Sequence, residues 1–100
     1  KEVVLNNRNE IKKILSLAVG NEENLIINIK SILSEPIKLG FSKIILVHNH
    51  PAGNPVPSNT DIEFTKKVLN ASKFLDIKLL DHIIIGDGTF ESVFRTDFYD

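Results

Sequence analysis

The apolar residues of this chain occur in short runs separated by turn-forming residues, and five of these runs predict β-strands. Residues Glu2 to Leu5 and Ile11 to Val19 are mainly apolar or β-branched and flank the turn-prone sequence NNRN, which predicts a hairpin. Lys43 to Val47 ends in consecutive apolar residues, as is typical of a strand buried on both faces. The runs from Lys78 to Ile85 and from Thr89 to Phe94 surround the turn sequence GDG and predict a second hairpin.

Two other segments have the spacing of an amphipathic α-helix. The first begins at Ile29 behind Asn28, a candidate cap, and Pro36 is expected to kink or split it. The second begins at Ser58. The apolar positions that define these helices are Ile29, Ile32, Leu33 and Ile37 in the first, and Phe64, Val68, Ala71 and Leu75 in the second. The order β-β-α-β-α-β-β predicts an α/β fold in which helices flank a mixed β-sheet.

The composition is that of one ordinary globular domain spanning residues 1–100. Hydrophobic residues make up 42% of the chain and charged residues 25%. Twelve basic residues are balanced by thirteen acidic ones, for a net charge of −1, and the basic residues form no dense block. The charge therefore gives no support to a nucleic-acid-binding surface.

The chain contains no cysteine, which removes disulfides, thiolate metal ligands and cysteine nucleophiles from consideration. This fits a reducing compartment, and we expect a cytoplasmic protein. We expect no membrane span, because no apolar run is long enough, and the first residues lack the pattern of a signal peptide. Because the chain opens directly on a strand-like run, we expect the domain to begin upstream of Lys1.

Two of the three histidines lie in one tripeptide, at the start of the stretch HNHPAGNPVPSNTD. Alternate side chains of a strand point to the same face, so His48 and His50 can converge on one ion. Asp61 can supply a carboxylate if the loop returns to the end of that strand. Two imidazoles and one carboxylate leave a fourth position for water, which is the pattern of catalytic zinc sites, and such a water becomes a nucleophile near neutral pH.

Each part of this pattern also has a purely structural explanation. Ser58-x-x-Asp61 ahead of an apolar helical pattern is a capping-box signal that needs no metal. A single histidine at a strand end is more often a hydrogen-bonded structural residue than a ligand, although two at positions i and i+2 are harder to explain in this way. We interpret His82, beside Asp81 in the strand LLDHIII, as structural. The GDG turn has no following helix, so we do not interpret it as a phosphate loop.

Two other metal-dependent classes do not fit the sequence. The letters HNH are coincidental, because HNH nucleases have those residues dispersed over a ββα motif. Zinc deaminases need an H-x-E with P-C-x-x-C pairing, and this chain has no cysteine.

The pattern His48-x-His50, seven further residues and then Ser58-x-x-Asp61 resembles the JAMM motif of the MPN-domain metalloproteases. More closely, IILVHNHPAGNPVPSNTD together with LLDHIIIGDGTFESV resembles the bacterial RadC family, whose members carry a JAMM-type domain at the C-terminal end. The resemblance implies a JAB/MPN architecture related to the deaminase-like α/β proteins. It also implies Zn2+ as the cofactor, with His48, His50 and Asp61 as ligands and Ser58 as a hydroxyl donor near the zinc water or the tetrahedral oxyanion.

In that family pattern a glutamate on the first strand serves as general base. The matching position falls just before Lys1, and Glu2 is the acidic residue nearest to it, which makes Glu2 the candidate general base within this chain. Because Glu2 is next to a free terminus, we expect it to fray. We therefore expect this chain to bind metal but to hydrolyse peptides poorly.

Three functions remain open at this point. The first is a zinc-dependent hydrolase of JAMM type, a peptidase or isopeptidase that acts on a peptide or protein substrate through zinc-bound water. The second is a non-catalytic metal-binding scaffold or interaction module associated with DNA repair or replication, the process that the family is traditionally labelled with. The third, metal-assisted action on nucleic acid, is the weakest, because the charge balance gives little affinity for phosphate. The sequence does not indicate an oligomeric state.

Overall fold

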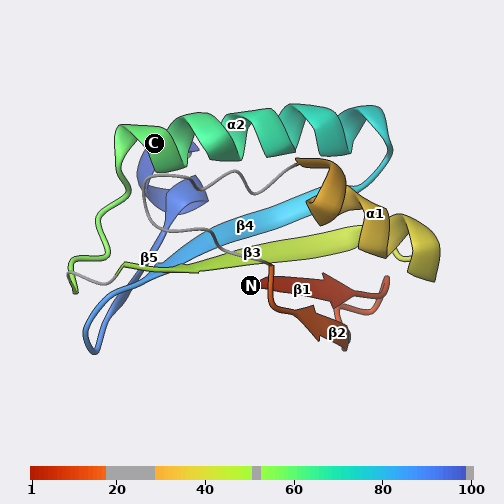
Figure 1. Cartoon of the computed structure of the whole chain (residues 1–100), viewed down its shortest axis with the longest axis horizontal. Helices are drawn as coiled ribbons and strands as arrows, with labels where there is room; N and C mark the ends of the chain where they lie inside the picture. The colour runs from red at the N-terminus through yellow and green to blue at the C-terminus, as the bar shows by residue number, and fades with distance from the viewer. Residues whose placement is uncertain (18–28, 51–52, 99–100) are drawn as a thin grey trace.

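The computed structural model of the chain describes residues 1–17, 29–50 and 53–98. They form five strands, two α-helices and a final turn of π-helix (Figure 1). In chain order the elements are β1 (Glu2–Leu5), β2 (Ile11–Leu15), α1 (Ile29–Leu39), β3 (Lys43–Asn49), α2 (Asn59–Phe74), β4 (Lys78–Ile85), β5 (Phe90–Ser92) and η2 (Phe94–Phe98). Neither α-helix of this described part is long and apolar enough to cross a lipid bilayer. The predicted order β-β-α-β-α-β-β is confirmed.

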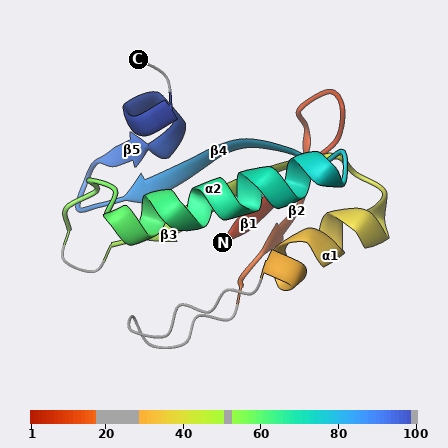
Figure 2. The ribbon, with the colours of Figure 1, turned by 90° about the horizontal axis from the view of Figure 1, so that it is seen from above.

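The five strands form one mixed sheet in the order β2-β1-β3-β4-β5. β3 and β4 are parallel, because α2 carries the chain back along the sheet between them, and the other neighbouring pairs are antiparallel. Seen from above, α2 crosses over these two central strands (Figure 2). Since β3 and β4 run in the same direction, their carboxyl ends lie side by side. His48 and Asn49 lie there, opposite Ile84 and Ile85.

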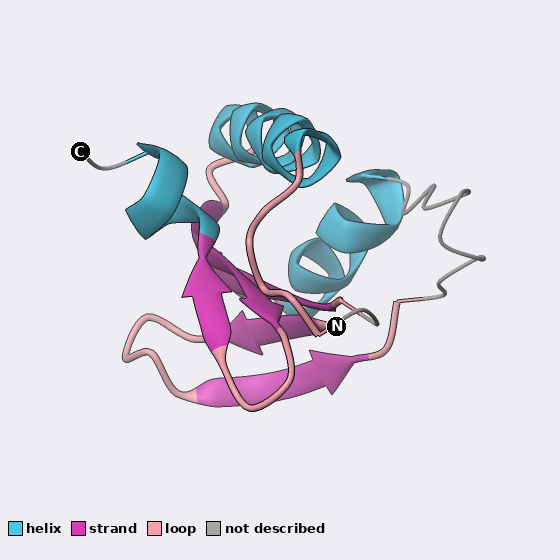
Figure 3. Cartoon of the chain, turned by 90° about the vertical axis from the view of Figure 1, so that its left-hand side faces the viewer, coloured by secondary structure: helices cyan, strands magenta, loops and turns pink. Residues whose placement is uncertain are grey.

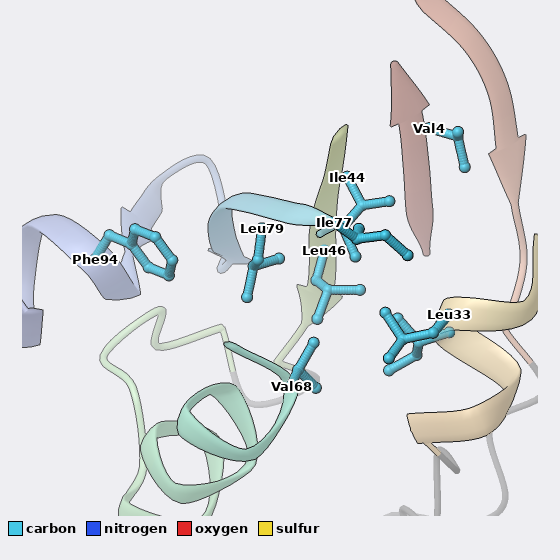
Figure 4. Packing of buried hydrophobic residues seen from close by; sticks show 9 residues of the cluster. Val4, Leu33, Ile44, Leu46, Val68, Ile77, Leu79 and Phe94 are labelled. Carbon is cyan, nitrogen blue, oxygen red and sulfur yellow. The ribbon is translucent and has the colours of Figure 1, made fainter. Parts of the chain in front are cut away.

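The helices lie on one face of the sheet, as Figure 3 shows. Alternation along β3 therefore gives its two faces different surroundings. Ile44 and Leu46 are buried beneath the helices, whereas Ile45 and Val47 on the opposite face are only half-buried. The prediction of a strand buried on both faces is wrong in this respect, because the described helices cover one face only. The buried core consists of Val4, Ile32, Leu33, Ile44, Leu46, Val68, Ile77, Leu79 and Phe94 (Figure 4).

The first helix passes through Pro36 as one continuous element, although the sequence led us to expect a kink or a split there. Proline removes one backbone donor from a helix. The loss is tolerated because Pro36 is buried against the core and α1 ends soon afterwards, at Leu39. The carbonyl oxygen of Pro36 accepts the N–H of Phe41 at 3.0 Å, which closes the end of the helix. The candidate cap Asn28 lies outside the described residues.

The second and last strands are shorter than the sequence predicted. β2 ends at Leu15, and the predicted end at Val19 lies outside the described residues. β5 ends at Ser92, where the chain turns into η2. The carboxylate of Asp81 favours this turn, because it accepts the Ser92 hydroxyl at 2.6 Å and the Phe94 N–H at 3.4 Å.

The buried face of α2 is rotated relative to the predicted one. Leu75, predicted to face the core, is 45% exposed. The hydroxyls of Thr65 and Ser72 are buried in its place, because Thr65 donates to the Asp61 carbonyl at 2.6 Å and Ser72 to the Leu69 carbonyl at 3.0 Å. The predicted positions Phe64 and Ala71 pack at the margin of the core, and the fully covered residues of α2 are Asp61, Thr65, Val68 and Ser72.

Replacing Ile44 by alanine tests the position of the core. Ile44 is 0% exposed, so Ile44→Ala loses apolar burial and leaves a cavity, and we expect the free energy of unfolding to fall by about 2–5 kcal/mol. Ile14 lies in the same sheet but is 57% exposed, and Ile14→Ala should change that free energy by about 0.5 kcal/mol at most. Urea unfolding followed by circular dichroism measures both changes. Equal losses would contradict the assignment of the core.

Candidate metal centre

Strand β3 carries the first histidine of the site and leads directly to the second. β3 continues two residues beyond the predicted end, to Asn49, so His48 is a strand residue and His50 follows it. The imidazole rings of His48 and His50 are perpendicular, with centroids 5.0 Å apart, and Asn49 between them is exposed. The backbone N–H of His50 donates to the Ile85 carbonyl at 2.9 Å. Both histidines therefore lie at the carboxyl end of β3, where hydrogen bonds to the end of β4 hold the backbone.

The loop between β3 and α2 packs against the β4–β5 turn. Gly53 adopts φ of 84°, a left-handed conformation that glycine accepts without strain. Its carbonyl oxygen accepts the Asp87 N–H at 2.9 Å. A Cβ atom on Gly86 would lie 2.4 Å from the same oxygen, so this close contact requires glycine. The turn sequence GDG thus supports the loop that carries the site, a role that the sequence did not indicate.

Ser58 ends this loop and caps α2, as the sequence predicted. The Ser58 Oγ atom accepts the Asp61 N–H at 3.1 Å, and Oδ2 of Asp61 accepts the Ser58 N–H at 2.8 Å, which confirms the capping box. The hydroxyl of Ser58 also donates to Oδ2 of Asp61, at 2.8 Å. These three hydrogen bonds fix the Asp61 side chain relative to the start of the helix.

The carboxylate of Asp61 also faces both histidines. Oδ2 lies 3.0 Å from Nε2 of His50, and Oδ1 lies 3.7 Å from Nδ1 of His48. One ligand atom from each of the three residues lies within 4.8 Å of the other two, and among the described residues this is the one such group. Two ligands about 2.0–2.1 Å from a tetrahedral ion lie roughly 3.4 Å apart. Each histidine lies near this distance from its own oxygen of Asp61, and the 4.8 Å limit holds for all three residues, so they could hold one ion between them.

The hydrogen bonds of His50 show whether a cation suits this group. Nδ1 of His50 lies 2.7 Å from the Asn54 carbonyl oxygen, which only accepts, so Nδ1 carries a proton. Nε2 faces the ionised carboxylate of Asp61, which also only accepts. This contact is favourable only with a second proton on the ring or with a cation between the two groups. These three side chains therefore fit a metal ion. The Asn54 carbonyl orients the His50 ring, as backbone carbonyls commonly do for histidines that bind metals.

Sequence reasoning missed the contribution of Asn54, because its backbone carbonyl rather than its side chain acts on His50. A backbone group leaves no pattern of residue types. The three prolines of the loop gave the available signal, since they indicate that its backbone is stiff.

Burial and charge have opposite effects on the pKa values of the site. Burial raises the pKa of the Asp61 carboxyl, but the hydrogen bonds from Ser58 and the charges of the two histidines outweigh it and hold the pKa below its ordinary value. Burial lowers the pKa of His48, and the charge of His50 adds to this effect against the attraction of Asp61. The site thus favours an ionised carboxylate beside a neutral His48 imidazole, which are the states that bind metals.

Comparison with known proteins agrees with this geometry. The family model of the RadC-like JAB domain matches residues 2–97. The chain belongs to the RadC-like JAB domain family. Its mixed five-stranded sheet with two helices is consistent with the JAB/MPN architecture that the sequence predicted.

Three UPF0758 proteins illustrate how this RadC-like domain relates to longer proteins. It is 45% identical over 91 residues to one from Clostridium acetobutylicum and 42% identical over 100 residues to one from Caldanaerobacter subterraneus. A third, from Roseiflexus, is 39% identical over 93 residues. These matches cover 91%, 100% and 93% of this chain, but 40%, 43% and 40% of the relatives. The chain thus spans about two fifths of their length.

Glu2 of the RadC-like domain is held in β1, so the expectation that it frays is wrong. It pairs with Leu15 of β2 on one side and with Leu46 of β3 on the other, and its side chain is fully buried. Its carboxylate oxygens have no hydrogen-bond partner among the described residues. Burial, reinforced by the charge of Glu35, raises the pKa of Glu2 to about 8. Its role as general base stays a prediction.

His82 is buried in β4, outside the group of three ligands. Its ring centroid lies 6.2 Å from that of His48, and its Nδ1 lies 2.6 Å from the Thr65 hydroxyl. Burial, reinforced by the charge of His48, lowers the pKa of His82 to about 4 and keeps it neutral. The structure thus agrees with a structural role for His82. Thr65 was not predicted, and its one signal in the sequence is a polar position one helical turn after Asp61.

The buried acid of Glu2 makes stability depend on pH. The unfolded chain releases the Glu2 proton near pKa 4.5, whereas the folded chain keeps it up to about 8. The folded state binds the extra proton between these values, so the free energy of unfolding falls as pH rises through this window. We expect Glu2→Gln, which cannot titrate, to flatten this decline in urea unfolding series across the same window. Glu63→Gln on the exposed side of α2 is the control, and a Glu2→Gln slope equal to the wild-type slope would refute the buried acid.

Proposed function

We propose that this RadC-like domain is a zinc-dependent hydrolase of JAMM type that cleaves a peptide or isopeptide bond in a peptide or protein substrate. The observation that carries the proposal is the convergence of His48, His50 and Asp61, with one ligand atom of each within 4.8 Å of the others. Three protein ligands leave a coordination position open, which distinguishes catalytic from structural zinc sites. Two imidazoles and one carboxylate also suit zinc better than magnesium or calcium, which prefer oxygen ligands.

The residues around these ligands would prepare the site for hydrolysis. A bound zinc ion would supply a Lewis acid and lower the pKa of water to near neutrality. Nδ1 of His50 donates its proton to the Asn54 carbonyl oxygen. This hydrogen bond leaves Nε2 as the ring nitrogen that would bind the metal. Ser58 holds the carboxylate of Asp61 in place. We propose that, when substrate binds, the Ser58 hydroxyl turns its one proton from Oδ2 of Asp61 to the substrate carbonyl oxygen and stabilises the negative charge that develops there, while the Ser58 N–H keeps its hydrogen bond to Asp61.

Hydrolysis of an amide also benefits from a carboxylate that accepts a proton and passes it to the leaving amine. Within this chain Glu2 is the candidate, because Leu46 lies opposite it and His48 is two residues further along the same face of β3. The unpaired carboxylate of Glu2 has a raised pKa, as is typical of groups that exchange protons in catalysis. The antiparallel register would place residues preceding Lys1 in a longer chain beside His48 and His50. A carboxylate at such a position would lie nearer to the ligands than Glu2 does.

A metal-binding scaffold without turnover is the second candidate function. Within the described ranges, the group of potential ligands contains one carboxylate, that of Asp61. This carboxylate would bind the metal, so it would not be free to act as a general base. A module of this kind would keep the ion for stability or for binding a partner. The two candidate functions share the metal site and differ in catalysis.

Metal content tests the ligand assignment. We expect the purified chain to bind about one zinc ion per molecule, and we expect His50→Ala to lose most of it, because the variant removes the nitrogen that faces Asp61. Asn49→Ala is the matched control, since Asn49 is the exposed neighbour between the two histidines. Mass spectrometric metal analysis after dialysis gives the stoichiometry. Full zinc content in His50→Ala would show that the ligand assignment is wrong.

Hydrolysis assays separate the two candidate functions. At equal zinc occupancy, we expect the 100-residue chain to cleave isopeptide and peptide substrates slowly. A longer chain that carries a carboxylate before Lys1, beside the histidines, should be faster by about 10²- to 10⁴-fold, the typical contribution of a general base. If the 100-residue chain is as active as the longer one and loses its activity in Glu2→Gln, the base is Glu2. If neither chain cleaves any substrate, the scaffold function is supported instead.

A further inference from the structure

Two buried polar side chains join the helix of the site to the sheet. Thr65 lies on the buried face of α2, one turn after Asp61, and His82 lies at the centre of β4. The Thr65 Oγ1 atom is 2.6 Å from Nδ1 of His82 and 2.6 Å from the Asp61 carbonyl oxygen. We propose that the Thr65–His82 pair positions Asp61 against the two histidine ligands. This inference rests on the metal binding of the proposed function.

The direction of the hydrogen bonds follows from the available protons. Thr65 has one hydroxyl proton, and the Asp61 carbonyl oxygen can only accept. The hydroxyl therefore donates to Asp61, and Nδ1 of His82 must donate to Thr65. This order requires a proton on Nδ1 of His82. Both side chains are almost fully buried, so loss of either partner leaves a polar atom unsatisfied.

The capping box cannot replace this link. Ser58 and Asp61 both belong to the start of α2. Their hydrogen bonds therefore do not fix the position of α2 relative to the sheet. His82 instead belongs to β4, which pairs with β3. In this pairing His82 lies opposite Leu46, two residues before His48. Thr65 thus connects the turn that carries Asp61 to the sheet that carries the histidine ligands. The separation of Asp61 from His48 is set by this connection between helix and sheet.

Removal of the Thr65 hydroxyl tests the inference in the 100-residue chain. Thr65→Val keeps a similar shape but deletes the link, and we expect the Kd for zinc, measured by competition with a chelator, to rise by about 10- to 100-fold. His82→Leu should give a similar rise. His82→Asn should restore affinity to near the wild-type value, because its amide nitrogen can donate to Thr65 in place of Nδ1. Thr65→Val carries the test if His82→Leu fails to fold.

Ser72→Ala is the matched control. Ser72 is as buried as Thr65 on the same helix and also donates to a backbone carbonyl, but its acceptor is Leu69, which is not part of the site. We expect Ser72→Ala to lower stability without changing the Kd for zinc. An equal loss of zinc affinity in Ser72→Ala and Thr65→Val would attribute the effect to helix stability and overturn the inference.

A readout without metal completes the test. Nitrogen-15 spectra of the metal-free chain should show His82 as the Nδ1-protonated tautomer, and Thr65→Val should remove this preference. The opposite tautomer in the wild type would overturn the inference. Wild-type zinc affinity in Thr65→Val, together with zinc loss in His50→Ala, would overturn the positioning role and leave the metal site intact. Absence of zinc binding by the wild type would overturn the proposed function as well.

Discussion

The site depends on the carboxylate of Asp61, because this one group accepts hydrogen bonds at the start of α2 and also faces both histidines. Its Oδ2 atom accepts the N–H and the hydroxyl of Ser58 and also faces Nε2 of His50. Burial alone would favour the protonated acid, and these partners keep it ionised. The negative charge at the start of α2 is further stabilised by the positive end of the helix dipole. A carboxylate in the first turn of α2 is thus also a member of the group that could hold a metal ion.

The topology of the sheet brings the two histidines to this carboxylate. β3 and β4 are parallel and adjacent, so the helix between them must begin near the carboxyl end of β3. His48 and His50 lie at that end, and the loop returns the chain to Ser58 within a few residues. The contact between Gly53 and the β4–β5 turn limits the path of the loop. Side chains carried by a strand end and by a capped helix start are held with little freedom.

Buried polar groups near the site differ in how they are satisfied. Thr65 and His82 satisfy each other between the helix and the sheet. Glu2 has no such partner among the described residues, and burial without compensation explains its raised pKa. A buried acid that weakens the fold at high pH is the kind of local cost that accompanies functional sites. The contrast fits the two different roles that we propose, in which Thr65 and His82 position Asp61 and Glu2 exchanges a proton.

The sequence by itself determined the element order, the capping box and the three candidate ligands, because each is encoded locally. Histidines at i and i+2 on a strand share a face, and Ser58-x-x-Asp61 closes on itself within one helical turn. The tertiary structure decided what depends on packing and register. The hydrophobic pattern predicted that Leu75 is buried, but the structure buries Thr65 and Ser72 instead. Their hydroxyls can be buried because they donate hydrogen bonds to carbonyl oxygens within the helix. The tertiary structure kept α1 continuous through Pro36, since burial outweighs one lost hydrogen bond. It also buried Glu2 and paired His82 with Thr65, because residues far apart in the sequence meet only when the strand register and the position of α2 are both fixed.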